Sequence, residues 1–168
     1  RSGRNTVQEV RLFEDRLLIY EPDVAVLQFC LNDAEVEGYA LPRLLPARAG
    51  RWLAWSYFYF AARFAYSQLL VGLDLWPDYA EYISAQYRPE SEGWQACRNA
   101  LTRFADLARK KGFRCAVVVF PIFTRIEPYP FREETRQVVR AAAEAGLPVL
   151  DLLPVYEGTD FDDLAVSR

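Results

Sequence analysis

The sequence predicts an α/β fold in which a doubly wound, mostly parallel sheet lies between two layers of helices. Two observations carry this prediction. A helical pattern followed by a short apolar run occurs three times, at residues 5–31, 92–120 and 132–153, and the runs are almost wholly apolar. Such strands are typical of parallel sheets covered on both faces. Alternating helices and strands with right-handed crossovers build a three-layer α/β/α, flavodoxin-like domain.

The first helix is expected at residues 5–20 and its strand, VAVLQFCL, at 24–31. Asn5 can cap the helix, Gln8 stands where a capping box requires an amide, and Pro22 ends the helix. The apolar stripe of this helix consists of Val7, Val10, Phe13 and Leu17. Because the stripe lies on one side, the helix is expected to pack on the sheet.

The second helix is expected at residues 92–111 with its strand at 115–120, and the third helix at 132–145 with its strand at 147–153. A glycine follows each of the two helices, as is usual at helix ends. One side of the second helix is apolar, with Trp94, Cys97, Leu101, Phe104 and Ala108. Both helices are therefore expected to cover the sheet.

An insertion at about residues 34–90 interrupts this alternation. It begins with a Pro-rich stretch and continues into residues 52–66, which hold eight aromatic side chains that would point to every side of a helix. Arg63 breaks the apolar run, which argues against a membrane-spanning helix. Two interpretations remain open: a helix sandwiched between the sheet layer and neighbouring segments, or a hydrophobic lid that binds acyl groups or faces a membrane. In both, residues 1–168 form a single domain.

Charge and composition exclude several functions. The formal charge is -3 and no dense run of Lys or Arg occurs, so a nucleic-acid partner is not expected. The three cysteines are far apart and fit neither a metal site nor a redox pair, so buried free thiols are the better interpretation. The chain has no histidine, which removes the usual general base at neutral pH.

The stretch of residues 2–35 carries the most functional information. SGRNT places Gly3 in a loop before the first helix, and CLND places Asn32 and Asp33 at the end of the first strand. With the Pro-Asp entry into that strand, the stretch resembles the SGNH (GDSL-like) hydrolase family of lipases and esterases. The resemblance implies an α/β/α fold in which Gly3 and Asn32 are oxyanion-hole donors. One position departs from the family's GxND motif, since its glycine is Cys30 here.

Oxyanion-hole chemistry explains these residue types. A tetrahedral acyl intermediate places negative charge on one oxygen, and N–H groups aimed at that oxygen stabilise it. Glycine lets a backbone amide approach closely, and asparagine adds a side-chain amide. Structural roles stay open: Gly3 for a turn with positive φ, and Asn32 with Asp33 as turn residues after a strand.

The resemblance also implies catalytic residues outside this sequence. The family's Ser nucleophile would precede Gly3, and its DxxH block would follow the last residue, so the chain is expected to be the central part of the domain, incomplete at both ends and inactive alone. Without a histidine to orient, aspartates have no triad role. That applies to Asp151, Asp160, Asp162 and Asp163.

The expected function is therefore that of a serine ester hydrolase, an esterase, a lipase or an O-acyltransferase, whose parent protein acts on a small-molecule or glycan acyl ester. No metal or organic cofactor is implied. An alternative is a non-catalytic carbohydrate- or lipid-binding module of the same fold, in which aromatic faces bind the ligand. Weaker candidates for substrate contact are Asp33, Trp52 and Trp55. The aromatic insertion is also a candidate for contact with lipid or membrane.

Overall fold

The computed structural model describes residues 4–35, 42, 45, 53, 56–123, 128–156 and 159. The chain separates into two compact units. The sheet unit consists of Arg1–Val36 and Ile83–Arg168, and the insertion unit consists of Glu37–Tyr82. The insertion unit falls within the range predicted for the insertion.

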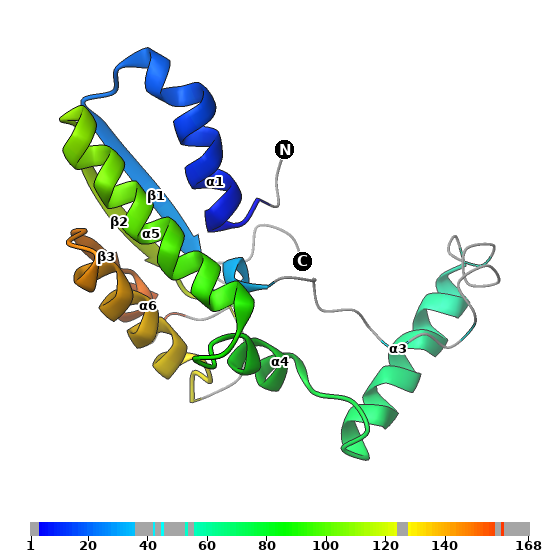
Figure 1. The fold of residues 1–168 in the computed structure, drawn as a ribbon. Coiled ribbons are helices and arrows are strands. Elements are labelled where there is room, and N and C mark those ends of the chain that lie inside the picture. Colours follow the sequence, from blue (N-terminus) through cyan, green and yellow to red (C-terminus); the bar gives the residue numbers. More distant parts are fainter. Residues whose placement is uncertain are drawn as a thin grey trace. The chain divides into compact units, whose positions relative to one another are not determined.

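The sheet unit contains an open sheet of three parallel strands, β1 (Val24–Cys30), β2 (Arg114–Phe120) and β3 (Val149–Asp151), in the order β1-β2-β3 (Figure 1). The fold is thus mixed α/β with a parallel sheet, as predicted. In register, Phe29 lies opposite Val119, and Val118 lies opposite Leu150. The carboxyl ends of all three strands therefore meet at one edge of the sheet.

Three helices pack on one another and on one face of this sheet: α1 (Thr6–Leu12), α5 (Glu92–Lys111) and α6 (Arg132–Glu144) (Figure 1). In β1 every second residue points into this layer and is buried, and in β2 Val117 and Val119 are buried in the same way. The core formed there includes Phe29, Leu101, Phe104, Val117, Val119 and Val138. Burial of these large apolar side chains is the main stabilising contribution to the unit.

The opposite face of the sheet is open in the part of the chain that the structure describes. Val24, Val26 and Leu150 are 49%, 61% and 54% exposed. The sequence predicted a strand covered on both faces for residues 24–31, and this holds for one face only. β1 therefore has the alternating burial of a strand between a core and solvent.

The helix predicted for residues 5–20 has three parts. The side chain of Asn5 caps α1 by accepting a hydrogen bond of 3.0 Å from the N–H of Gln8, as predicted. The chain then continues as a π-helical turn, η1 (Phe13–Leu17), and a 3₁₀ turn, η2 (Leu18–Tyr20). These forms place the side chains of residues 13–20 differently from a regular α-helix.

The two later helices agree closely with the sequence. α5 spans Glu92–Lys111, its predicted apolar stripe is buried, and it ends at Gly112 with φ of 78°, a conformation that glycine adopts without strain. β3 is shorter than the predicted strand at 147–153. The reason is that the carboxylate of Asp151 accepts a hydrogen bond from the N–H of Leu153, where the short helix α7 (Leu153–Tyr156) begins.

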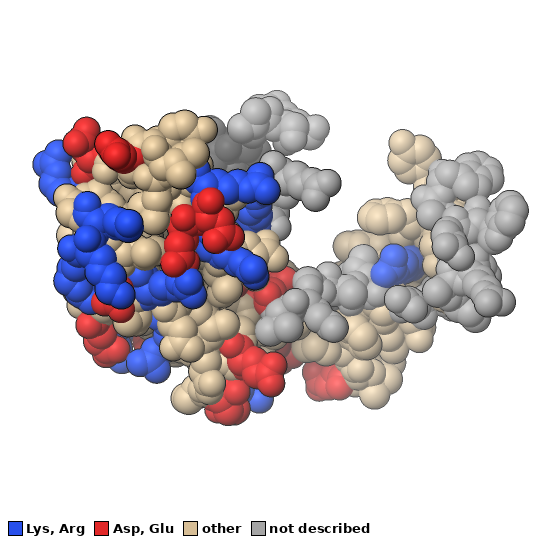
Figure 2. Space-filling view, turned by 45° about the horizontal axis from the view of Figure 1, so that its top comes forward, with Lys and Arg blue, Asp and Glu red and all other residues tan. Residues whose placement is uncertain are grey.

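The insertion unit contains α3 (Tyr57–Gly72) and the start of α4 (Tyr79–Gln86), which continues into the sheet unit. Ser56 caps α3 by accepting a hydrogen bond from the N–H of Tyr59. Figure 2 shows charged side chains crowding the visible surface of the sheet unit, whereas the visible described surface of the insertion unit is mostly uncharged. Among the described residues, none of the helices has the length and apolarity needed to cross a membrane.

Candidate functional site

The candidate site lies at the carboxyl end of β1, where the chain forms a 3₁₀ turn, η3 (Leu31–Ala34). In open parallel sheets, ligands bind outside the carboxyl ends of the strands. The two polar residues of this turn, Asn32 and Asp33, point in different directions. Asn32 is exposed and Asp33 is buried.

Asp33 holds the turn to α1 and to the end of β1. Its Oδ2 accepts a hydrogen bond of 2.7 Å from the hydroxyl of Thr6, which is fully buried, and one of 3.2 Å from the N–H of Cys30. The second bond is half of a capping box, in which the backbone N–H of Asp33 donates to the thiol of Cys30. Burying a carboxylate without hydrogen-bond partners costs free energy of folding. These two bonds therefore hold the Asp33 side chain in one position.

Two further side chains fix the turn from α5 and from the segment before it. The hydroxyl of Tyr87 donates a hydrogen bond of 2.7 Å to the carbonyl of Leu31, and the thiol of Cys97 donates one of 3.2 Å to the carbonyl of Asp33. Tyr87 also packs against Trp94, with ring centroids 5.0 Å apart. The carbonyl groups of Leu31 and Asp33 therefore have hydrogen-bond donors inside the protein.

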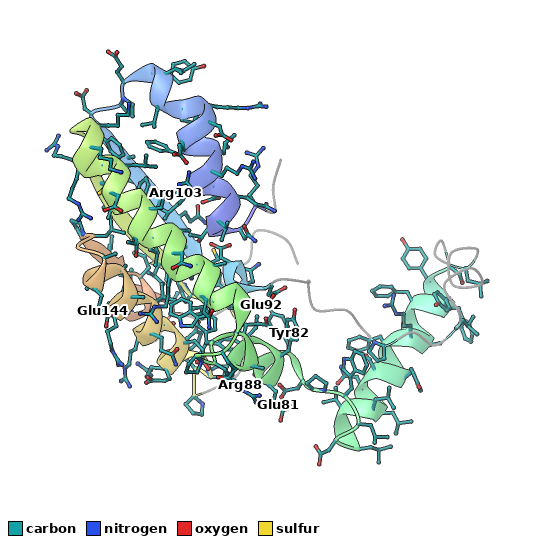
Figure 3. All side chains as sticks on the ribbon, viewed as in Figure 1. Glu81, Tyr82, Arg88, Glu92, Arg103 and Glu144 are labelled. Carbon is teal, nitrogen blue, oxygen red and sulfur yellow. The ribbon has the colours of Figure 1, made fainter. Side chains whose placement is uncertain are left out.

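An ion pair reinforces the packing of α5 against the helical segment that follows α1. Arg103 of α5 pairs with Glu14 of η1, and Figure 3 labels Arg103 on the side of α5 nearest α1. Phe13 packs edge-on against Phe104 beneath it. Through these contacts, α5 holds the helix that carries Thr6 next to the turn.

Burial changes the acidity of this cluster. It raises the pKa of the Asp33 carboxyl above its usual range, although the hydrogen bonds from Thr6 and the Cys30 N–H lower it in part. The pKa of Glu9 is also raised, first by burial and then by the charge of Asp33, while Arg4 lowers it. Two carboxyl groups that resist ionisation therefore lie close to each other between α1 and β1.

The thiols near the site are poor nucleophiles. Burial raises the pKa of Cys97 to about 12, with a further contribution from the charge of Asp33, so this thiol stays protonated and donates its hydrogen bond. Burial likewise raises the pKa of Cys30, although a hydrogen bond from Gln28 lowers it. These directions agree with the interpretation of Cys30 as a small apolar residue rather than a reactive thiol.

A groove of about 730 Å³ runs along the edge of β1 beside α1. Its walls include apolar strand and helix residues, and its polar lining consists of Arg4, Glu9, Gln28, Cys30, Asn32 and Asp33. The side-chain amide of Asn32 has no hydrogen bond to the rest of the described chain. Within the described part of the chain, Asn32 therefore has an unused amide donor in the lining of an open groove.

The structure describes two of the five predicted site residues, Asn32 and Asp33. Asn32 and Asp33 lie together on η3 and both line the groove, while Oδ2 of Asp33 also holds the turn through Thr6 and Cys30. Gly3, Trp52 and Trp55 lie outside the described residues. Of the aspartates without a triad role, Asp151 caps α7, and the remaining three lie outside the described residues.

Sequence reasoning missed the side chains that hold the turn. Thr6, Tyr87 and Cys97 are buried and reach the turn from three separate segments, and nothing in the local sequence of Tyr87 or Cys97 indicates this role. The sequence predicts Cys97 in the apolar stripe of the second helix, and Cys97 is buried on α5. One signal could have found Thr6, namely its place directly after the cap residue of the helix that precedes β1.

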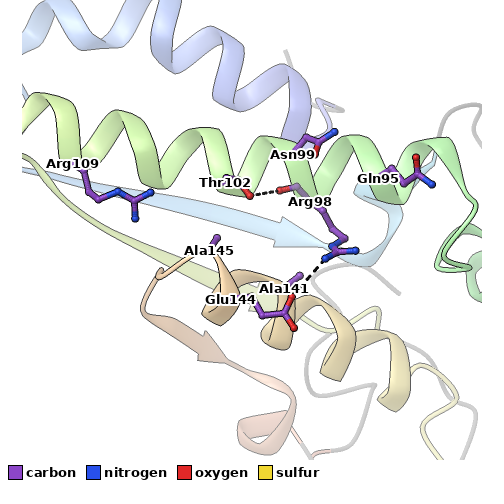
Figure 4. A pocket seen from close by; sticks show the side chains of 8 residues that line it. All are labelled: Gln95, Arg98, Asn99, Thr102, Arg109, Ala141, Glu144 and Ala145. Carbon is purple, nitrogen blue, oxygen red and sulfur yellow. Dashed lines mark hydrogen bonds and ion pairs between the residues drawn. The ribbon is translucent and has the colours of Figure 1, made fainter.

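A second groove, of about 570 Å³, lies between α5 and α6 (Figure 4). Its polar lining is made of long surface side chains, and Arg98 and Glu144 form an ion pair of 3.6 Å across it. Its lining residues come from α5, from α6 and from Ala145 directly after α6. Exposed ion pairs of this kind contribute little, and the groove has no buried polar group to bind a ligand.

Among the described residues, no group of three or more His, Cys, Asp or Glu side chains is arranged to hold a metal ion. Comparison of the chain with protein-family models, with curated proteins and with solved structures finds no match.

Proposed function

We propose that this chain is the central part of a serine ester hydrolase of the SGNH type and supplies its oxyanion-binding residues. The observation that carries the proposal is the unused, exposed amide of Asn32 at the carboxyl end of β1, beside an open groove. Such an amide could donate a hydrogen bond to the oxygen that becomes negative when an ester carbonyl is attacked. In this proposal Gly3 contributes a backbone N–H as the second donor.

The buried network around Asp33 supports a fixed position for this donor. An oxyanion donor stabilises the transition state only if it is already in place when charge develops, so that no reorganisation is required. The turn that carries Asn32 is bonded to α1 through Thr6 and to α5 through Cys97. In this proposal Asp33 orients Asn32 and has no contact with the ester.

In this proposal the nucleophile and the base come from residues outside this sequence, since the chain has no histidine to act as the base. A further strand that carries the nucleophile could pair with β1, because β1 lies at an edge of the described strands. A further parallel strand at that edge would end beside Asn32, which is where a nucleophile would have to stand. The full domain would then have the three-layer α/β/α arrangement, with a further layer over Val24 and Val26.

The substrate class in this proposal is an acyl ester of a small molecule or a glycan, cleaved by hydrolysis or passed to another alcohol. The apolar walls of the groove, which include Val10, Phe13 and Leu27, suit an acyl or aliphatic group better than a charged one. Serine chemistry of this type uses neither metal nor organic cofactor.

A fluorophosphonate probe tests the proposal, because it forms a covalent bond with an activated serine oxygen as fluoride leaves. The longer polypeptide that contains this chain should be labelled on a serine outside the present sequence. The chain of 168 residues alone should remain unlabelled. Labelling of a serine within this chain, or no labelling of the longer polypeptide, would contradict a serine hydrolase of this type.

A further inference from the structure

Two carboxyl groups line the groove beside the turn η3, one from Glu9 of α1 and one from Asp33 of the turn itself. Glu9 is half-buried, and Asp33 is 9% exposed. Glu9 stands three residues after Thr6 in α1, so their side chains lie on the same side of the helix. That side faces the turn, because the hydroxyl of Thr6 lies 2.7 Å from Oδ2 of Asp33. Glu9 and Asp33 are therefore neighbours between α1 and η3.

In the part of the chain that the structure describes, neither carboxyl group has a cation in contact. Glu9 and Asp33 form no ion pair there, and Arg4 is the one positively charged residue among the described residues that line the groove. Burial and the charge of Asp33 raise the pKa of Glu9 by more than the charge of Arg4 lowers it. Two partly buried carboxylates without a paired cation cost free energy when both are ionised.

The other titratable groups near the pair stay neutral at and below neutral pH. These groups are the thiols of Cys30 and Cys97 and the phenol of Tyr87, which lie near Asp33 at the end of β1, on α5 and ahead of α5. Mainly because of burial, the pKa of each of them is above its ordinary value, so all three remain protonated. Between acid and neutral pH, only the two carboxyl groups change the charge of this cluster.

Protonation of the pair is linked to the contact between α1 and η3. That contact depends on Oδ2 of Asp33, which accepts hydrogen bonds from Thr6 and from the N–H of Cys30. A carboxyl group whose pKa is raised in one arrangement favours that arrangement when protonated and opposes it when ionised. The pKa values of Glu9 and Asp33 are both raised, mainly by burial. The stability that they contribute is therefore fully present in acid and is lost as pH rises through their folded-state pKa values.

We propose that Glu9 and Asp33 form a proton-linked latch between α1 and η3, which is closed when the pair holds a proton and loosened when both carboxyl groups are ionised. The latch makes the turn that carries Asn32 more rigid in acid than at neutral pH. The inference is independent of the hydrolase proposal, because it requires neither an ester nor a residue outside this chain.

Hydrogen exchange at the N–H of Cys30, measured by NMR on the full chain, tests the latch. This N–H is bonded to Asp33, so it exchanges when the turn opens. After correction for the intrinsic exchange rate, its protection should fall as pH rises from about 4 to 7. The N–H of Val117, which donates to the carbonyl of Pro148, reports global unfolding and should be protected more strongly. Protection at Cys30 that equals that of Val117, or that does not fall with pH, would overturn the inference.

A matched set of variants separates the pair from other charges nearby. In Glu9→Gln the repulsion is absent at every pH, so the fall in Cys30 protection should be smaller than in the unchanged chain. Arg4→Gln removes the nearby cation, so the fall should be larger. Asp15→Asn removes an exposed carboxylate that pairs with Arg11, and the fall should equal that of the unchanged chain. The inference is wrong if Glu9→Gln and Asp15→Asn alter the fall equally, or if Arg4→Gln makes it smaller.

Discussion

Asp33 shows how one buried carboxylate can organise the end of a strand. Its Oδ2 accepts hydrogen bonds from the hydroxyl of Thr6 and from the N–H of Cys30, so a single oxygen links η3 to α1 and to β1. Asn32, the residue before Asp33 in the same turn, is exposed. The exposure of one residue and the burial of the next follow from this arrangement, because a short 3₁₀ turn points consecutive side chains in different directions.

Removing the hydroxyl of Thr6 should destabilise the sheet unit. Thr6→Val keeps the shape of the side chain but leaves the buried carboxylate with one donor fewer, at an expected cost of about 1–3 kcal/mol. Urea denaturation at neutral pH measures this cost. The control is Thr102→Val, which removes an exposed hydroxyl bonded to the carbonyl of Arg98 and should cost less than about 0.5 kcal/mol. Equal costs for the two variants would mean that the bond to Asp33 contributes nothing.

The raised pKa of Asp33 predicts a pH dependence of stability. The folded state favours the protonated carboxyl, so its contribution is fully present below the unfolded pKa of about 3.9 and is lost as pH rises through the folded-state pKa. Asp33→Asn stays neutral at every pH, and its amide oxygen can accept the two bonds that Oδ2 accepts. The variant should therefore gain stability relative to the unchanged chain as pH rises from about 4 to 7.

Urea midpoints measured over that pH range check the sign. Asp23→Asn, which changes an exposed aspartate ahead of β1, serves as the control. A difference for Asp33→Asn that shrinks as pH rises would show that the buried carboxylate is stabilised in its ionised form.

At the scale of single residues, the sequence predicted the capping residues and the apolar stripe of α5 well, and the network around the turn poorly. The stripe predicted for residues 5–20 is buried only at Val10, and Leu17 is exposed. The cap at Asn5 and the end of α5 at Gly112 depend on local chemistry, which is visible in a short stretch. The contact between Thr6 and Asp33 joins residues 27 positions apart, and the contact between Cys97 and Asp33 joins residues 64 positions apart. Only packing of the whole unit brings such pairs together.

At the scale of elements, β1 has two faces with different surroundings. Leu27 points into the core and is 6% exposed, whereas its neighbour Val26 is mostly exposed. The sequence alone predicted burial on both sides, because the apolar composition of the strand does not distinguish a covered face from an open one. An open face this apolar is a liability for a protein in water.

Adjacent substitutions in β1 test this asymmetry. Leu27→Ala should lower the free energy of unfolding by about 2–5 kcal/mol, because it leaves a cavity in the core. Val26→Ala should cost about 1 kcal/mol or less, since its side chain already contacts solvent. Thermal unfolding of both variants provides the comparison. Similar losses would mean that the second face of the sheet is covered as fully as the first.

At the scale of the whole molecule, the two units have different surfaces. The sheet unit has a buried core and a charged exterior, whereas four aromatic side chains of α3 in the insertion unit are exposed: Tyr57, Phe58, Phe60 and Phe64. The sequence predicted where the insertion lies and that it is aromatic. It left open whether the aromatics are buried, since rings on every side of a helix suit both a sandwiched helix and a lid. Several rings of α3, among them Tyr57 and Phe58, are exposed, and both interpretations of the insertion stay predictions.

The account as a whole depends on Asn32 being an oxyanion donor held by a rigid turn. In the longer polypeptide, Asn32→Ala should lower kcat for ester cleavage by roughly 10²–10³-fold with little change in KM, because the lost bond forms only in the transition state. Asn99→Ala, which changes an exposed asparagine on α5, should leave kcat unchanged. Stability should be equal in both variants, since the Asn32 side chain takes no part in the bonds that hold the turn. An unchanged kcat in Asn32→Ala, or an equal loss in Asn99→Ala, would contradict the assignment.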